Sequence, residues 1–331
     1  MDTSSYSQDS PSLAEDREPG LRRGEGASRG SATPEDSDED LYRGAEDIEE
    51  ERKNRDKTVV SRLWEGVSVS ASVDLLSYSD REWRGNTTKS VLIKKGYRLV
   101  AQRFGRLCKV RGDNYCALRA TLFQILSQSQ RLPPRLRDME IQSSLQADRH
   151  LIGQWKFPFG NRKSSTTQGT MAQLHVYLDL LRDRWTAAVQ SSPAEREVLV
   201  QQVFQGQEEE FGLLEAVKYL MLRTASEIHG LLEMETQEVP DFSWLLFARD
   251  SSSSPQALFR NHLSHVGFSG GLEQVEMCLL GFSVEHRLQV YRLYKADSQE
   301  FLTYYPSEQK ADWPCLPLIT EDDRHYNVPV E

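Results

Sequence analysis

The apolar positions of this 331-residue chain follow a helical period over several stretches beyond about residue 58. In "CALRATLFQIL" (residues 116–126), Leu118, Leu122 and Ile125 recur at the spacing of one helical face. The same spacing runs through residues 213–232, through "SPQALFRNHLSHV" after its Ser-Pro start, and through "GGLEQVEMCLLGFSV" after its glycine pair. These stretches predict helices.

The period changes towards the C-terminus. Four short stretches there are rich in β-branched or aromatic residues and are separated by turn-prone clusters, which is typical of strands. They are "RLQVYRLY", "EFLTYYP", "LPLIT" and "HYNVPV". Helices followed by strands predict an α+β fold whose central sheet is assembled late in the chain.

Residues 1–57 differ in composition from the rest. Their large apolar residues are few: Met1, Tyr6, Leu13, Leu21, Leu41, Tyr42 and Ile48. Such a segment cannot bury enough apolar surface to offset the entropy of ordering. We therefore expect a disordered N-terminal tail over 1–57 and a folded domain over 58–331.

One part of the tail, residues 38–53 or "DEDLYRGAEDIEEERK", has apolar residues at helical spacing. Acidic residues precede basic ones, which matches the helix dipole. This pattern is consistent with a segment that becomes helical when it binds a partner. The alternative is a solvated acidic patch without a binding role.

The formal net charge is −10, and residues 1–57 carry −8 of it, with 17 acidic against 9 basic residues. The near-neutral body has no basic block that would favour nucleic acid. Its four cysteines contain no C-x-x-C pair, so neither a disulfide framework nor a zinc module is expected, and we predict no metal or other cofactor. Without a signal peptide, a lipidation motif or a long apolar run, we expect a cytoplasmic protein that does not enter a membrane.

Cys116 follows a Gly-Asp-Asn sequence. Asp113 and Asn114 are good N-cap residues, so the thiol is expected in the first turn of a helix. There the free N–H groups and the helix dipole favour thiolate, and the same groups can hold an oxyanion. The alternative is an inert, buried cysteine.

A thiolate nucleophile requires a histidine base that a third group orients. His325 is followed two residues later by Asn327, and in a strand such residues point the same way, about 6.5–7 Å apart. Cys, His and Asn in these roles form the arrangement of papain-like proteases. The alternative is a solvated histidine at a strand end. Among the other histidines, we expect His262 and His265 to have a structural role and His286 to be a surface residue.

Six segments, in this order along the chain, resemble the OTU deubiquitinases, in the branch that acts on linear ubiquitin chains. They lie within a resemblance that covers roughly residues 38–330. The segments are "EWRGNT" (82–87), "GDNYCALRA" (112–120), "LFARD" (246–250), "RNHL" (260–263), "GGLEQVEM" (270–277) and "EDDRHYN" (321–327).

The resemblance implies a papain-like, OTU-type fold and a role for each matching residue. Cys116 matches the nucleophile, His325 the general base and Asn327 the residue that orients it. Asp113 matches an acid whose backbone helps to shape the oxyanion hole. Asp322 matches a residue that can hold the histidine in an unproductive pose without substrate.

Three further positions match residues that face the substrate in this family. Trp83 matches an aromatic near the active centre. Leu245 corresponds to a contact for the apolar patch of the distal ubiquitin, and Glu300 to a reader of the proximal ubiquitin beside its N-terminal methionine. From the residues alone, Leu245 could equally be core and Glu300 a solvated strand residue.

The acidic stretch of the tail also resembles a motif of this family, which binds the PUB domain of the linear ubiquitin ligase catalytic subunit. Tyr42 is then the anchor. Gly44 departs from the expected alanine, which slightly lowers helix propensity. The surrounding contacts are Asp40, Leu41, Ala45, Glu46, Asp47 and Ile48.

The resemblance thus implies a cysteine peptidase that hydrolyses methionine-linked linear ubiquitin and counteracts the linear ubiquitin chain assembly complex, with NF-kappa-B signalling and innate immunity as the setting. We expect a monomer whose partners are linear polyubiquitin and a PUB domain. One alternative is a catalytically silent scaffold that binds linear ubiquitin. Another is a papain-like protease with other substrates.

Overall fold

The computed structural model describes residues 66–137, 140–158, 166–234, 239–308 and 313–331. These residues belong to one compact unit, Asp56–Glu331. The expected tail, with the acidic stretch around Tyr42, lies outside the described residues, so the boundary at residue 57 stays a prediction.

Six strands of the described residues form one sheet, in the order β1-β2-β6-β5-β3-β4. All neighbouring pairs are antiparallel except β3 and β5. The four strands expected near the C-terminus are confirmed, but the sheet also includes two short N-terminal strands that the sequence did not indicate. The strands are β1 (Val73–Asp74), β2 (Arg106–Cys108), β3 (Arg287–Arg292), β4 (Leu302–Tyr305), β5 (Cys315–Thr320) and β6 (Tyr326–Val330).

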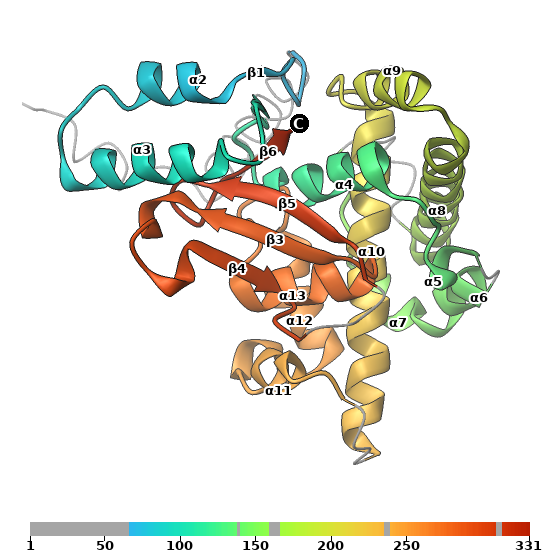
Figure 1. The fold of residues 1–331 in the computed structure, drawn as a ribbon. Coiled ribbons are helices and arrows are strands. Elements are labelled where there is room, and N and C mark those ends of the chain that lie inside the picture. Colours follow the sequence, from blue (N-terminus) through green and yellow to red (C-terminus); the bar gives the residue numbers. More distant parts are fainter. Residues whose placement is uncertain (1–65, 138–139, 159–165, 235–238, 309–312) are drawn as a thin grey trace, which may run out of the picture. The chain divides into compact units, whose positions relative to one another are not determined.

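Helices cover both faces of this sheet, which confirms a mixed fold of helices and a central sheet (Figure 1). Short 3-10 helices lie between helices at Asp250–Ser252 and Leu263–His265, and between β3 and β4 at Leu293–Lys295 and Gln299–Phe301. The helices are α2 (Leu75–Glu82), α3 (Thr88–Val100), α4 (Cys116–Gln128), α5 (Pro134–Arg137), α6 (Glu140–Ala147), α7 (Arg149–Ile152), α8 (Thr167–Gln190), α9 (Pro193–Val203), α10 (Glu208–Glu233), α11 (Phe242–Phe247), α12 (Pro255–Asn261) and α13 (Gln274–Ser283).

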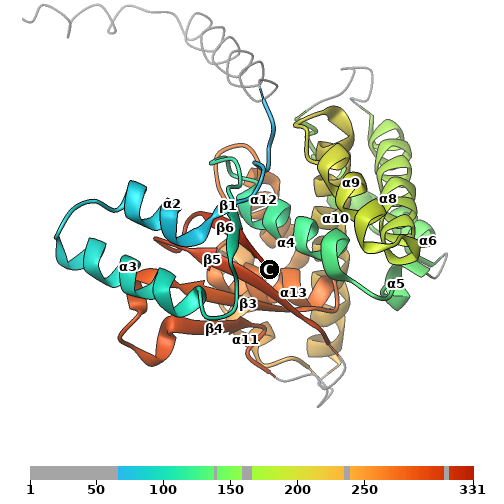
Figure 2. The ribbon, with the colours of Figure 1, turned by 45° about the horizontal axis from the view of Figure 1, so that its top comes forward.

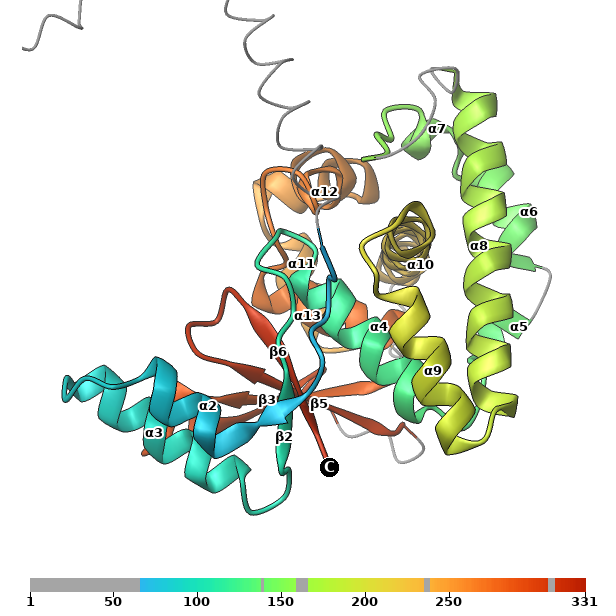
Figure 3. The ribbon, with the colours of Figure 1, turned by 90° about the horizontal axis from the view of Figure 1, so that it is seen from above.

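Helices α2 and α3 lie on one side of the sheet, apart from the other helices (Figures 2 and 3). Their buried aromatic and aliphatic side chains form a separate small core with residues of β2, β3 and β5. Tyr78 and Tyr97 meet edge to face there, with ring centroids 5.9 Å apart. The apolar stripe of each helix thus buries against the sheet and fixes where α2 and α3 lie.

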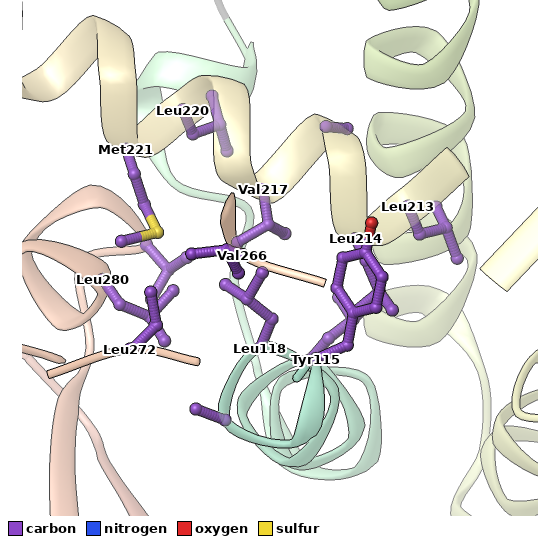
Figure 4. Close-up of a cluster of buried hydrophobic side chains, with 14 of the residues drawn as sticks. Tyr115, Leu118, Leu213, Leu214, Val217, Leu220, Met221, Val266, Leu272 and Leu280 are labelled. Atoms are coloured by element: carbon purple, nitrogen blue, oxygen red, sulfur yellow. The ribbon is translucent and has the colours of Figure 1, made fainter. Parts of the chain in front are cut away.

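The larger core lies on the other side, where α4 runs between the sheet and the long helix α10 (Figure 3). Figure 4 shows Leu118 of α4 facing Val217 and Leu214 of α10, with Tyr115 beside them. Helix α10 is buried around most of its circumference over residues 210–222 because α8 and α13 also pack against it. Helix α4 is therefore held rigidly at its first turn, where Cys116 lies.

His286 corrects a prediction. It was expected on the surface, but it is 2% exposed, with its ring centroid 5.8 Å from that of Trp185. Its Nδ1 lies 2.6 Å from the carbonyl oxygen of Val284, because Glu285 adopts a left-handed conformation (φ 53°) that turns the chain inward after α13. Burial lowers the pKa of His286 to about 4, so the ring is neutral in the folded protein.

This burial predicts acid sensitivity. In the unfolded chain this histidine has a pKa of about 6.5, so between pH 6.5 and 4 its ring takes up a proton in the unfolded state but not in the folded state. The contribution to the free energy of unfolding that is present above pH 6.5 is therefore lost as the pH falls towards 4. The loss should reach about 3 kcal/mol below pH 4. His286→Asn retains an amide donor for Val284 but cannot titrate, so its melting temperature should fall less over this range. An unchanged pH dependence in this variant would contradict the assignment.

No helix in the described part of the chain combines the length and apolar character that crossing a membrane requires.

Candidate active site

Cys116 is the first residue of α4, with Tyr115 at the N-cap position, and its side chain is buried (4% exposed). The thiol donates to the carbonyl oxygen of Arg324 across 3.4 Å and accepts a hydrogen bond from the backbone of Tyr326. Arg324 and Tyr326 flank His325 in the chain. The sulfur therefore lies against the backbone that carries the histidine, although 209 residues separate the two in sequence.

His325 and Asn327 are joined through their side chains. Nε2 of His325 lies 3.3 Å from Oδ1 of Asn327, and the same oxygen accepts the backbone N–H of Val110 at 2.9 Å. Asn327 is 3% exposed on β6. A buried amide oxygen held in this way selects the tautomer with the proton on Nε2, which leaves Nδ1 of His325 as a proton acceptor.

The protonation of Cys116 differs from the expectation for a helix N-terminus. Burial raises the pKa of the thiol, aided by the charge of Asp113, and this outweighs the opposing effects of the Tyr326 and Ala117 N–H groups and of Arg119. The helix N-terminus thus lowers the pKa of the thiol as expected, but burial raises it more because the sulfur is shielded from water. In this state the cysteine is a thiol.

Asp113 organises the loop before α4. Its Oδ1 accepts the backbone N–H of Tyr115 at 3.0 Å and binds Nη1 of Arg119 at 2.5 Å. Its own N–H donates to Arg111, and the N–H of Cys116 donates to the carbonyl oxygen of Asp113. Both N–H groups are occupied, so an oxyanion at this helix start would have to compete with those two carbonyl oxygens.

Two buried residues that the sequence did not single out, Arg119 and Glu210, support the loop before α4. Arg119 is fully buried, and its Nε binds Oε1 of Glu210 at 2.5 Å. Glu210 also accepts the hydroxyl of Ser68 and the backbone N–H of Gly206. An arginine within the apolar stretch of a predicted core helix was the one available signal, since a buried charge requires a partner.

A second buried network holds Tyr115, the residue before Cys116. Its hydroxyl donates to Oε1 of Glu215 at 2.6 Å, and Lys218 and Trp155 bind the same carboxylate, each at 2.6 Å. Burial lowers the pKa of Lys218, against the opposing effect of Glu215. Every polar atom of the Glu215 carboxylate is thus engaged, and the start of α4 is tied to α10.

The turn between β5 and β6, residues 321–325, ends at His325. Oδ1 of Asp322 accepts the backbone N–H groups of Arg324 and His325, at 3.0 and 3.1 Å. Glu321 accepts Trp83 Nε1 at 2.8 Å and the Tyr97 hydroxyl at 2.6 Å. Asp322 therefore belongs to this turn and Trp83 is hydrogen-bonded to it through Glu321, and neither is hydrogen-bonded to the sulfur.

The two positions matched to ubiquitin contacts are both exposed. Leu245 is 68% exposed on α11, and its neighbour Trp244 is 64% exposed, so Leu245 does not belong to the core. Glu300 extends into solvent and binds Lys295 at 2.9 Å and Arg292 at 3.2 Å. Burying this apolar pair against a partner would be favourable, because it would remove apolar surface from water.

His262, Glu273 and Glu276 bring potential metal ligands within 4.8 Å of one another. The two carboxylates, however, already bind the guanidinium of Arg249, and His262 Nδ1 lies 3.0 Å from Glu276. Arg249 supplies the positive charge that a cation would bring. The cluster therefore has a structural role, joining α12 to α13.

The model of peptidase family C101 matches residues 67–330. Among solved structures, h/ceOTUB1 in complex with ubiquitin aldehyde and UBCH5B~Ub shares 11% sequence identity over 86% of this chain and 98% of that chain, with a TM-score of 0.54. A complex with UBC13~Ub has a TM-score of 0.56 at the same identity and coverage. At such identity the likeness shows a shared OTU-type, papain-like fold. The family match, over most of the chain, shows that this protein belongs to peptidase family C101.

Proposed function

We propose that this chain is an OTULIN-type cysteine peptidase that hydrolyses the methionine-linked bond of linear ubiquitin chains. One observation carries the proposal: the Cys116 sulfur contacts the backbone on both sides of His325, whose ring is bonded to Asn327. A thiol, an imidazole and an orienting amide in this relation form a nucleophile, a base and its support. The family match supports the reaction class, and the sequence resemblance supports the linkage.

In the proposed mechanism, His325 Nδ1 takes the proton of Cys116 as the sulfur attacks the carbonyl carbon of the last glycine of the distal ubiquitin. The resulting imidazolium is stabilised by its Nε2–H bond to Asn327. It then protonates the leaving α-amine, which releases the proximal ubiquitin and leaves a thioester. A water molecule, deprotonated by His325, hydrolyses that thioester and restores the thiol.

Because burial raises the pKa of Cys116, the resting thiol holds its proton, and the proposed mechanism transfers that proton to His325 as the sulfur attacks. Substrate binding would favour this step if the scissile carbonyl displaced the loop carbonyls that now occupy the Asp113 and Cys116 N–H groups. The Cys116 thiol would thus be less reactive in the resting enzyme than in the complex with substrate.

For substrate recognition, we propose that Leu245 and Trp244 receive the apolar patch of the distal ubiquitin and that Glu300 lies beside the N-terminus of the proximal one. The exposure of all three supports these roles. A linear linkage is a backbone α-amide, so a site that fits the residues around that methionine excludes lysine isopeptides by shape.

The test is incubation of the full chain with linear diubiquitin and with each lysine-linked diubiquitin. We expect cleavage of the linear dimer alone. Equal cleavage of lysine-linked dimers would contradict the linkage assignment. Tight binding of the linear dimer without cleavage would instead identify a silent scaffold.

From the resemblance we further propose a cytoplasmic protein that counteracts the linear ubiquitin chain assembly complex in NF-kappa-B and innate immune signalling. Docking would use the tail motif around Tyr42, which lies outside the described residues. We expect Tyr42→Ala to weaken binding to the PUB domain at least about 10-fold, because an aromatic anchor carries much of the energy of a small interface. Peptidase activity should stay unchanged, and calorimetry that finds equal affinity for the variant would refute the motif.

A further inference from the structure

The turn that presents His325 contains a residue in an unfavourable backbone conformation. Asp323 has φ +64°, the left-handed region that non-glycine residues seldom occupy. Its backbone N–H donates to the Thr320 hydroxyl at 2.8 Å. A conformation of this kind persists only where surrounding contacts determine it.

Those contacts come from Arg292, the last residue of β3. Its Nε donates to Asp323 Oδ1 at 2.8 Å, and its Nη2 donates to the other carboxylate oxygen. The Tyr294 hydroxyl donates to that same oxygen and accepts from Nη2 of Arg292 at 2.7 Å. A two-point guanidinium–carboxylate contact fixes the orientation of the carboxylate as well as its position.

The sheet explains why Arg292 reaches this turn. It lies opposite Thr320 in the β3–β5 register, and the turn begins immediately after Thr320. The Arg292 side chain is 8% exposed and that of Asp323 is 25% exposed, so the pair is largely shielded from solvent. Removing Arg292 would leave the Asp323 carboxylate without its cationic partner, and removing either side chain would take the two-point contact from the turn.

The third contact of Arg292 points outward. Its Nη1 binds Glu300 at 3.2 Å, and Glu300 is 57% exposed and also bound to Lys295. The guanidinium therefore links a solvent-facing carboxylate to the turn that carries the base. A group on a substrate that engaged Glu300 would act on the same guanidinium that holds Asp323.

We propose that Arg292 is a positioning residue for the peptidase reaction: through Asp323 it holds the β5–β6 turn so that His325 lies against Cys116. The inference rests on the proposed peptidase function but not on the preferred linkage. Arg292 need not touch substrate. Its effect is on the geometry of proton transfer, where small displacements of a base cause large losses of rate.

The experiment compares Arg292→Met, Arg292→Lys, Asp323→Gly and the double variant Arg292→Met/Asp323→Gly. Glycine removes the carboxylate but tolerates φ +64°, so this variant tests loss of the Arg292–Asp323 contact without adding backbone strain. The control is Arg223→Met, which removes another partly buried arginine that bridges two carboxylates, Asp148 and Glu227. Each variant is assayed on linear diubiquitin and on ubiquitin with a C-terminal fluorogenic amide, which has no proximal ubiquitin.

We expect the three single variants to lose kcat at least about 10-fold on both substrates, with KM within about 2-fold of the parent. Lysine at position 292 should not restore kcat, because its single ammonium group cannot make the two-point contact with the Asp323 carboxylate. The double variant should be no slower than Arg292→Met, since both changes remove one interaction. Arg223→Met should lower the melting temperature but retain kcat.

Three results would overturn the proposal. The first is a kcat of Arg292→Met within about 2-fold of the parent. The second is a loss confined to KM on linear diubiquitin, which would make Arg292 part of the binding surface. The third is an Arg223→Met variant that loses kcat as Arg292→Met does, which would indicate general destabilisation. Because the fluorogenic amide contains no interubiquitin linkage, an error in the linkage proposal would leave this comparison intact.

Discussion

Replacing Cys116 with alanine should abolish hydrolysis of linear diubiquitin, with kcat/KM falling by at least about 10⁴-fold. The methyl group provides no nucleophile, and the remaining base and amide cannot form the thioester. The fold should tolerate the change because alanine is a good helix former and the Sγ atom makes only weak bonds, one of them to the Arg324 carbonyl at 3.4 Å. Ubiquitin binding should persist, since Leu245 and Glu300 are untouched.

The matched control is Cys108→Ala. Cys108 is also buried and free, but it lies on β2, and burial raises its pKa to about 11. This variant should retain activity and should still react at one cysteine with a ubiquitin C-terminal electrophile. Mass spectrometry locates the adduct. An adduct on a cysteine other than Cys116, or full activity in Cys116→Ala, would remove the proposed nucleophile.

The parts of the site that the sequence revealed are those set by local geometry. Cys116 after Gly-Asp-Asn predicted a thiol at a helix start, and the structure places it at the first residue of α4. His325 and Asn327 are two apart, and their side chains are bonded. Such features depend on a few neighbouring residues, so spacing rules reach them. The expected N-cap was wrong, however: Tyr115 takes that position without a side-chain capping bond, and not Asp113 or Asn114.

The supports of the site depend on contacts between distant residues. Glu321 binds Tyr97 and Trp83 across more than 220 positions, and Arg119 binds Glu210 across 91. No periodicity links such pairs, because each forms only when the sheet and its covering helices have assembled. The strands β1 and β2 escaped detection for the same reason, since two or three residues acquire strand geometry only from their neighbours in the sheet.

The charge state of Cys116 shows the same limit. The helix N-terminus is a local feature and favours thiolate, but the degree of burial is decided by the whole fold. At Cys116 burial prevails and raises the pKa. At His286 the same effect turns an apparent surface histidine into a neutral core residue. The sequence therefore identified the chemical groups near Cys116 and His286 but did not predict how far the fold shields them from water.

Gly267 has the most restrictive backbone environment near the site. It has φ +87°, and an added Cβ would overlap the ring of Tyr115 at Cε2, Cζ and the hydroxyl. The ring cannot readily move aside, because it is fully buried, lies edge to face with Phe211, and donates its hydroxyl to Glu215. The same loop is tied to the segment before Cys116 by Asn114, whose amide donates to the carbonyl oxygen of Phe268 at 2.8 Å. A side chain at Gly267 must therefore displace the residue that immediately precedes Cys116.

We therefore expect Gly267→Ala to destabilise the protein by about 4 kcal/mol, from left-handed strain together with overpacking. Its melting temperature should fall by about 10 °C, and the folded fraction should also turn over more slowly because Tyr115 directly precedes Cys116 at the start of α4. Gly270→Ala is the control in the same loop, since its added Cβ would meet His265 at an ordinary 3.8 Å. Calorimetry and kcat on the fluorogenic ubiquitin amide would measure both effects. Equal stability and rate for the two variants would mean that the Gly267 loop does not constrain Tyr115, and the rigid support inferred for the nucleophile would have to be abandoned.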